Sequence, residues 1–275
     1  MFERALALRP RDGAGYRRVG TVLQSLGRID EAAAIYGRWI QVEPNNPTAT
    51  HMLASCTGQD VPARATDAFV KDTFDGFADS FDQKLDKLHY RAPGLILDAV
   101  ATTLGEPTAA LDILDAGAGT GWCGPPLKPY ARQLVGVDLS PKMLAKAAER
   151  AVYDALHTAE LVAYLRGQVA AFDLIVSADT LVYFGELSEA LRAAAGALRP
   201  AGHLIFTVER ADDAPESGYR LSPHGRYTHA EAYVRATLAE AGLATVAVTR
   251  VHLRLQGGAP VEELLVVAKV APKAG

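Results

Sequence analysis

The alternation of apolar and polar residues predicts strands and helices that follow one another in turn from about residue 105 onward. Apolar runs at 111–116, 134–137 and 172–176 have the length of buried strands, and helical patterns separate them. Strands that alternate with helices form a mainly parallel sheet covered on both faces. The pattern therefore predicts an α/β fold with a doubly wound, Rossmann-like sheet.

Several helices in this part have clear start or stop signals. Ser140 is an expected N-cap with Pro141 at the first helical position, and residues 186–198 form another helical pattern. The letters THAE at 228–231 read as a capping box, and Gly242 is expected to end the helix that follows.

The end of the chain predicts a different connection. Residues 245–255 and 261–270 are two strand-like runs that are separated only by QGGAP. This spacing is too short for a crossover helix, so the two runs are expected to form an antiparallel hairpin.

The first 57 residues have a separate, helical periodicity. The letters LRPRD at 8–12 return as VEPNN at 42–46, which is 34 residues later. This period resembles a tetratricopeptide repeat, with Gly27 closing one helix and Asp30 capping the next. About one and a half repeats are fewer than a free solenoid needs, so we expect the array to lean on the rest of the chain or on another subunit, or to be truncated. We expect this helical region either to form a groove for a peptide or protein partner, or to act as a structural cap or homodimer contact.

Residues 58–66 read as a linker, which places a domain boundary between the helical region 1–57 and a larger domain, 67–275. Within the larger domain, residues 67–104 form an aromatic helical segment ahead of an α/β core at 105–275. Phe74, Phe77 and Phe81 recur at intervals of three and four, so we expect them to share one helical face.

Composition narrows the class of protein. Of 275 residues, 49% are apolar and 22% charged, as in globular proteins, and no membrane span or signal peptide is evident, so a cytoplasmic protein without a membrane partner is expected. A net charge of −4 without a basic block argues against nucleic acid as a partner. Cys56 and Cys123 lie too far apart to indicate a disulfide framework or a metal site.

The most specific chemical signal is a glycine-rich turn after the first apolar run. Residues 111–121 read LDILDAGAGTG, and Asp138 ends the next apolar run about twenty residues beyond the first glycine. Bare backbone lets a ligand approach closely, and an acid at that spacing accepts hydrogen bonds from a ribose. The segment predicts a nucleoside site.

The position of the third glycine distinguishes between two classes of nucleoside site. A dinucleotide fingerprint needs glycine at 122, where this chain has Trp122. The G-x-G-x-G pattern instead resembles the first motif of class I S-adenosylmethionine-dependent methyltransferases. VDLSPKML at 137–144, FDLIVSAD at 172–179 and LRPAGHL at 198–204 resemble later motifs of the same family, in the same order.

This resemblance implies a seven-stranded sheet that ends in the antiparallel hairpin, with S-adenosylmethionine as cofactor and S-adenosylhomocysteine as product. It implies an aromatic lid over the cofactor, although core packing explains Phe77, Phe81 and Tyr90 equally. Glu160 is the candidate acid for the adenine amino group, with a solvated helix cap as the alternative. The expected cofactor contacts are Tyr90, Asp115, Gly117, Ala118, Gly119, Gly121, Asp138, Leu139, Met143, Glu160, Leu161 and Asp179.

Candidate catalytic residues lie beside the predicted transfer site. Asp179 is expected to face it with Tyr183 nearby, and the polar segment 219–229 follows the fifth strand, whose carboxyl end borders the ligand site. His224 or His229 is a candidate general base, and Arg226 a candidate contact for an anionic substrate group. A solvated loop before a capped helix is the alternative for this segment.

These observations favour a methyltransferase acting on nitrogen or oxygen of a small-molecule acceptor. A protein methyltransferase that uses the helical repeats for recognition is a second hypothesis, and a non-catalytic nucleoside-binding protein is a third. No motif in the sequence identifies the acceptor.

Overall fold

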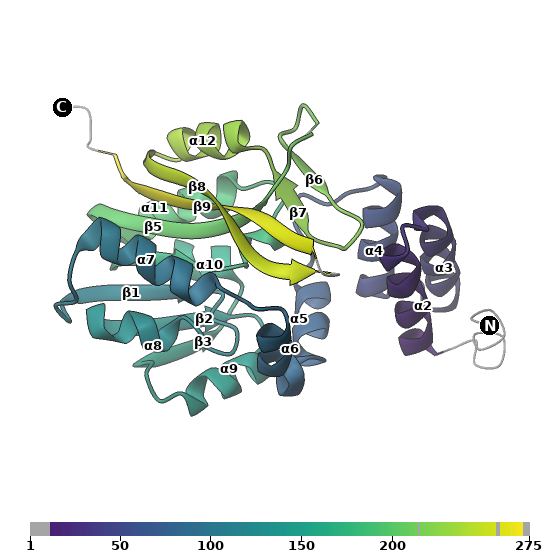
Figure 1. Cartoon of the computed structure of the whole chain (residues 1–275), viewed down its shortest axis with the longest axis horizontal. Coiled ribbons are helices and arrows are strands. Elements are labelled where there is room, and N and C mark those ends of the chain that lie inside the picture. The colour runs from purple at the N-terminus through teal and green to yellow at the C-terminus, as the bar shows by residue number, and fades with distance from the viewer. Residues whose placement is uncertain (1–11, 214, 257–258, 272–275) are drawn as a thin grey trace.

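The computed structural model describes residues 12–213, 215–256 and 259–271. Figure 1 shows a small group of helices to one side of a larger part built around a sheet. The group, here called the helical unit, consists of α2 (Gly13–Ser25), α3 (Ile29–Val42) and α4 (Pro47–Thr57).

The helical unit has an apolar core of its own, in which Tyr16, Leu23, Tyr36 and Trp39 are buried. Helices α2 and α3 approach closely at Gly20, because a Cβ atom there would lie 2.3 Å from Cζ of Tyr36. The unit is therefore a packed cluster rather than a set of separate helices. Its likeness to a tetratricopeptide repeat stays a prediction.

The helix boundaries in this unit agree with the sequence at one position and differ at another. Gly27 lies just after α2 with φ of 71°, as expected for a glycine that ends a helix. The predicted cap at Asp30 is wrong, because α3 begins at Ile29 with Arg28 as its N-cap residue. Asp30 lies in the first turn instead, where a negative charge favours the helix dipole. Of the first repeated motif only Asp12 is described, and it caps α2.

Four short elements lead from the helical unit into the sheet: α5 (Asp67–Asp75), η1 (Ala78–Ser80), α6 (Phe81–Lys87) and α7 (Ala92–Leu104). The prediction of one aromatic helical face is wrong, because α5 ends at Asp75. Phe74 and Phe81 still pack together with ring centroids 5.9 Å apart, whereas Phe77 packs beneath the Lys84 ammonium, 3.6 Å away.

The described residues form one nine-stranded sheet whose centre is the parallel series β3-β2-β1-β4-β5. Strand β9 pairs antiparallel with β5, and β8 with β9, which confirms the C-terminal hairpin. The strands are β1 (Leu111–Ala116), β2 (Ala131–Asp138), β3 (Ala155–Thr158), β4 (Phe172–Ser177), β5 (Leu198–Arg210), β6 (Tyr219–Leu221), β7 (Tyr227–His229), β8 (Leu243–Gln256) and β9 (Ala259–Val270).

Two of these strands were not predicted, so the expected number of seven is corrected to nine. Strands β6 and β7 form a hairpin in the segment that was interpreted as a polar loop. Strand β5 continues beyond its pairing with β4, and Glu209 and Arg210 then pair with β7. The predicted capping box is also wrong, because His229 belongs to β7 and the helix begins at Glu231 after Ala230.

Helices cover both faces of the sheet, as the doubly wound prediction requires. Ile113 packs with Val100 and Leu127 on one face, and Leu114 packs with Leu165 and Leu191 on the other, because successive strand residues point in opposite directions. The remaining helices are α8 (Gly124–Leu127), η2 (Lys128–Tyr130), α9 (Pro141–Glu149), α10 (Leu161–Arg166), η3 (Leu181–Tyr183), α11 (Ser188–Ala197) and α12 (Glu231–Glu240). Ser140 caps α9 as predicted.

The helical unit contacts the turn between β6 and β7, beside which it lies in Figure 1. His51 Nε2 lies 2.9 Å from the Gly225 carbonyl, and Ser55 donates to the Pro223 carbonyl at 3.1 Å. These contacts attach α4 to the α/β part.

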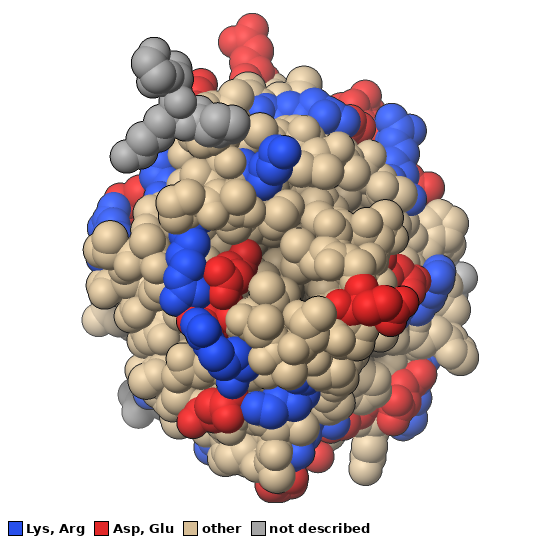
Figure 2. All heavy atoms as spheres, turned by 90° about the vertical axis from the view of Figure 1, so that its left-hand side faces the viewer, with Lys and Arg blue, Asp and Glu red and all other residues tan. Residues whose placement is uncertain are grey.

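The molecular face turned away from the helical unit carries acidic and basic side chains interspersed with uncharged ones (Figure 2). On the described part of that face, no extended region of a single sign is visible. This face therefore does not present the uniformly basic surface that binds a phosphate backbone. None of the described helices combines the length and the apolar character that crossing a membrane requires.

Candidate active site

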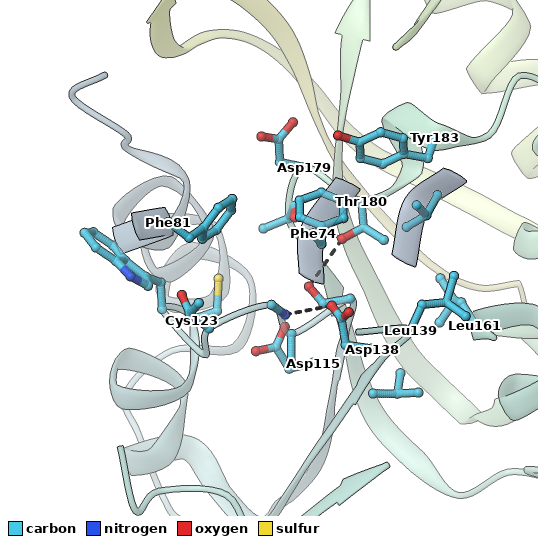
Figure 3. A pocket seen from close by; sticks show the side chains of 18 of the residues that line it. Phe74, Phe81, Asp115, Cys123, Asp138, Leu139, Leu161, Asp179, Thr180 and Tyr183 are labelled. Atoms are coloured by element: carbon cyan, nitrogen blue, oxygen red, sulfur yellow. Dashed lines mark hydrogen bonds between the residues drawn. The ribbon is translucent and has the colours of Figure 1, made fainter. Parts of the chain in front are cut away.

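A cavity of about 960 Å³, counting space open to solvent, lies at the carboxyl ends of β1, β2 and β4. Open α/β sheets bind ligands at this edge. In Figure 3, Asp179 and Tyr183 lie in the upper part of the cavity, and Leu139 and Leu161 lie at the lower right with Asp138 beside Leu139. Phe81 lies on the left, Phe74 lies between Phe81 and Tyr183, and Asp115 lies at the bottom.

The glycine turn forms part of the cavity wall. Gly117 and Gly119 line it with φ of 84° and 53°, conformations that glycine adopts readily. A Cβ atom at 117 would lie 2.1 Å from Thr180 Oγ1, whereas a Cβ at 119 would meet open space. Ala118 also lines the cavity, but Gly121 does not and packs beside Tyr153. The cofactor contact at Gly121 therefore stays a prediction that the cavity lining does not support.

Asp138 is held rigidly at the end of β2. Its Oδ2 accepts a hydrogen bond from the Gly119 amide at 2.9 Å, and its Oδ1 accepts one from the Ser140 amide at 2.8 Å. Burial raises the pKa of this carboxyl, which the two amide donors oppose. The adjacent Leu139 lines the cavity, whereas Met143 is fully buried and is not part of the lining, so its contact with the cofactor stays a prediction.

Asp115 lies beneath the turn and is 1% exposed. Its Oδ2 accepts a hydrogen bond of 2.6 Å from the Tyr153 hydroxyl. Burial raises the pKa of Asp115 to about 6, and the nearby Asp138 adds to this effect. Tyr153 was not predicted, because it lies in an irregular segment after α9 that carries no motif.

Glu160 caps a helix and also lines the cavity. Its Oε2 accepts from the Ala163 amide at 2.7 Å and so caps α10. Its Oε1 is buried without a hydrogen-bond partner among the described residues, and the side chain lines the cavity with Leu161. The nearest cation, Arg64, lies 4.0 Å away. One oxygen is structural, and the other is available to a ligand.

Asp179 leaves β4 in the left-handed region, with φ of 53°. Its amide donates to Thr207 Oγ1 at 2.9 Å, and its Oδ2 accepts from Arg254 Nη1 at 2.7 Å. Its Oδ1 is buried and has no hydrogen-bond partner among the described residues. Non-glycine residues adopt this conformation rarely, and such strain concentrates at functional sites.

Helices α5 and α6 cover the cavity with Phe74, Phe81 and Leu85. Ser140 donates to Asp75 Oδ1 at 2.5 Å, and Thr120 donates to Asp82 Oδ1 at 2.6 Å. These bonds join both covering helices to the glycine turn and the β2 end. Phe77 does not line the cavity, whereas Tyr90 does.

A buried ionic network continues from Asp179 away from the cavity. Arg254 also contacts Glu209 at 2.5 Å and Glu263 at 3.1 Å. Glu209 in turn contacts Arg226 at 2.5 Å and His224 at 3.3 Å. Burial raises the pKa of Glu263 to about 8.

The two candidate general bases do not lie at the cavity. His224 faces Glu209, and His229 is fully buried with Nε2 3.1 Å from the Gly185 carbonyl. Burial lowers the pKa of each imidazole to about 4. Arg226 lies outside the cavity wall as well, so of the four predicted catalytic residues only Tyr183 lines it. The catalytic roles of His224, His229 and Arg226 stay predictions that the cavity lining does not support.

Comparison with known proteins agrees with this geometry. Residues 114–206 match the family model described as a methyltransferase domain. Human methyltransferase-like protein 27 is 39% identical over 84 residues, which are 30% of this chain and 34% of that protein. A ubiquinone biosynthesis O-methyltransferase from Methylocella silvestris is 28% identical over 123 residues, 44% of this chain and 46% of that protein. The chain thus spans between a third and a half of these relatives.

Among solved structures, magnesium protoporphyrin IX methyltransferase from Synechocystis with bound S-adenosylhomocysteine superimposes with a TM-score of 0.51. It is 17% identical, and the match covers 66% of this chain and 84% of that one, which is a likeness of fold. Residues 114–206 thus resemble a methyltransferase domain in sequence, and the sheet has the fold of a solved methyltransferase that holds S-adenosylhomocysteine.

Proposed function

We propose that this protein transfers a methyl group from S-adenosylmethionine to a small-molecule acceptor. The observation that carries this proposal is one cavity with two chemically distinct ends, a nucleoside end at Asp138 and Leu139 and a second end at Asp179 and Tyr183 (Figure 3). Donor and acceptor can therefore meet inside a single enclosure.

The residues of the first end fit a nucleoside. Asp138 keeps unused lone pairs beyond its two amide bonds, so it can accept from both ribose hydroxyls. Leu139 and Leu161 offer apolar surfaces to the adenine ring, and Glu160 Oε1 is a free acceptor for its amino group. Gly119 presents bare backbone between them.

The aromatic part of the cavity wall suits a cationic sulfur. Phe74, Phe81 and Tyr90 line it, and each aromatic face attracts a cation by roughly 0.5 to 2 kcal/mol. Asp115 offers a carboxylate beside the turn, and the bond from Tyr153 fixes its direction. These groups would hold the methionine part of the donor.

S-adenosylmethionine supplies an activated methyl group on a sulfonium leaving group. The protein's own contribution is alignment, which accounts for as much as roughly 7 to 11 kcal/mol in well-oriented reactions. The covering helices α5 and α6 hold Phe74 and Phe81 over the cavity. Tyr183 remains a neutral donor, because burial raises its pKa to about 12.

The extent of the cavity supports a small acceptor over a peptide. Its lining begins at Arg64, and no described residue of the helical unit belongs to it. The helical unit contacts the β6–β7 turn, and its His51 stacks on Phe69 of α5 with ring centroids 3.9 Å apart. A protein acceptor presented by the repeats would need a path from the unit to the cavity.

Calorimetric titration tests this proposal directly. We expect S-adenosylmethionine and S-adenosylhomocysteine each to bind at one site per chain, and NAD not to bind. Absence of binding by both S-adenosylmethionine and S-adenosylhomocysteine would overturn the proposed function, while their binding without any methyl transfer would favour the non-catalytic alternative.

A further inference from the structure

We infer that the methyl acceptor is an amine carried on an apolar or aromatic body, and that Asp179 Oδ1 binds its nitrogen. This inference rests on the proposed function and names the substrate class for the same cavity. It is carried by the fixed, unpartnered oxygen of Asp179 and by the charges and rings around it.

Asp179 is positioned as a receptor for a hydrogen-bond donor. Thr207 fixes its amide, and Arg254 occupies its Oδ2. Oδ1 is buried without a partner among the described residues, on a side chain that lines the cavity. A buried carboxylate oxygen without a donor is costly, so a ligand that supplies an N–H group there gains binding energy.

The charges that line the cavity favour a cationic ligand over an anionic one. Four carboxylates line it: Asp115, Asp138, Glu160 and Asp179. Among the described lining residues Arg64 is the single cation, and its guanidinium donates to Asp67 at 2.5 Å. A carboxylate or phosphate acceptor would meet like charge at Asp179 without a free cation to bind it.

Aromatic rings surround the same end of the cavity. Phe74 packs edge to face against both Phe81 and Tyr183, with ring centroids 5.9 and 5.5 Å apart. In Figure 3 these rings and Asp179 enclose the end that lies away from Leu139 and Leu161. Rings attract cations and also pack against apolar bodies, so this end suits an amine on a hydrophobic frame.

The reaction balances without a strong base. The bound ammonium loses one proton to solvent and becomes a neutral amine. One remaining N–H group donates to Asp179 Oδ1, and this hydrogen bond orients the nitrogen lone pair toward the methyl group. The lone pair then forms the N–C bond while the C–S bond breaks, and the bonding electron pair stays on sulfur. Positive charge moves from sulfur to nitrogen, where the Asp179 carboxylate stabilises it. A hydroxyl acceptor would need a base, and neither His224 nor His229 lies at the cavity.

The test uses three probes of similar shape and different charge on the full chain saturated with S-adenosylhomocysteine. 2-Phenylethylamine is expected to bind about tenfold more tightly than 2-phenylethanol, as charged hydrogen bonds generally exceed neutral ones, and 3-phenylpropionate most weakly. Asp179→Asn should remove the preference for the amine, because it replaces a charged hydrogen-bond acceptor with a neutral one. The affinity for S-adenosylhomocysteine should stay within about twofold. Asp98→Asn, an exposed change on α7, is the matched control and should retain the preference.

The outcomes separate the two proposals. Retained S-adenosylhomocysteine binding without any preference for the amine overturns the amine inference and leaves the methyltransferase proposal intact. An amine preference that persists in Asp179→Asn also overturns it. If the unaltered protein does not bind S-adenosylhomocysteine, the proposed function itself is overturned. With tyramine, which carries an amine and a phenol, methylation on nitrogen supports the inference, and methylation on oxygen alone contradicts it.

Discussion

Arg254 Nη1 lies 2.7 Å from Asp179 Oδ2, so a strand of the C-terminal hairpin holds the carboxylate that leaves β4 at the cavity. The same guanidinium contacts Glu209 and Glu263, which are both buried. One cation thus serves three carboxylates from separate strands or strand ends. The network fixes Asp179 and ties the hairpin to the centre of the sheet.

Replacing Arg254 with Met should destabilise the fold strongly. The change leaves Glu209 and Glu263 buried without their shared guanidinium, and breaking a buried ion pair costs roughly 3 to 5 kcal/mol. Urea unfolding measures this loss. Arg250→Met, an exposed change on the same strand, is the control and should alter the free energy of unfolding little. Equal stability of the two variants would contradict the network's role.

Asp138→Ala should weaken S-adenosylhomocysteine binding by roughly tenfold or more, since hydrogen bonds to a charged group each contribute about 1.5 to 3 kcal/mol. The change removes the proposed ribose acceptor and releases the amides of Gly119 and Ser140. Calorimetry gives the affinity, and circular dichroism verifies the fold. Unchanged affinity would remove Asp138 from the cofactor site.

The sequence was sufficient to predict the parts of the site that depend on local chain geometry. The glycine turn, Asp138 and the end of β4 all follow directly from strands whose apolar runs are visible in the sequence. Parallel strands bring their carboxyl ends to one edge, so these residues must meet. Ser140, Gly27 and Gly242 marked helix ends for equally local reasons.

The residues that were missed depend on tertiary packing. Arg254 lies between Leu253 and Leu255 in the sequence, and this alternation predicts that its side chain faces solvent. In the structure the Arg254 side chain is only 6% exposed, because three acidic side chains from other elements surround it. One signal was present in the sequence. Glu262 and Glu263 are adjacent in a strand, so one of the two must face the interior and need a cation there.

Residue type alone does not locate the histidines of segment 219–229 relative to the cavity, because their burial depends on tertiary structure. A histidine beside a predicted site resembles a general base, but β7 turns His229 into the aromatic cluster with Tyr233, at a centroid distance of 6.0 Å. Strand β7 forms only because β5 extends past β4. Local sequence does not contain that length difference.

The close approach of α2 and α3 gives a paired prediction about the helical unit. Gly20→Ala would place a methyl group 2.3 Å from Tyr36 Cζ, and such overpacking costs about 1 to 3 kcal/mol. Gly37→Ala lies in α3 with no atom within 4 Å of the new Cβ, so it should stabilise the helix by about 0.5 to 1 kcal/mol. Thermal unfolding should move in opposite directions for the two variants. Shifts of the same sign would contradict this packing.

Asp115 predicts a pH dependence of stability with a definite sign. Its pKa in the folded protein, about 6, lies above the value near 3.9 of an unfolded chain, so the folded state binds the proton more tightly. The resulting stabilisation is present below about pH 4 and is lost as the pH rises through about 6. Asp115→Asn keeps an acceptor for the Tyr153 hydroxyl but never ionises. At pH 8 it should therefore raise the free energy of unfolding of the unliganded protein by about 2 to 3 kcal/mol.

The difference between Asp115→Asn and the unaltered protein should shrink toward zero at pH 4, where both side chains are neutral. Urea unfolding at pH 4, 6 and 8 measures it, with Asp98→Asn as the exposed control. A difference that is constant across this range would show that the Asp115 carboxyl titrates equally in the folded and unfolded states. The same variant should bind S-adenosylhomocysteine less tightly at pH 8, because it lacks the Asp115 carboxylate that is proposed to stabilise the ammonium group of the ligand. Burial of this same carboxylate charge lowers the free energy of unfolding. Higher stability with weaker binding would place Asp115 among residues that trade stability of the fold for function.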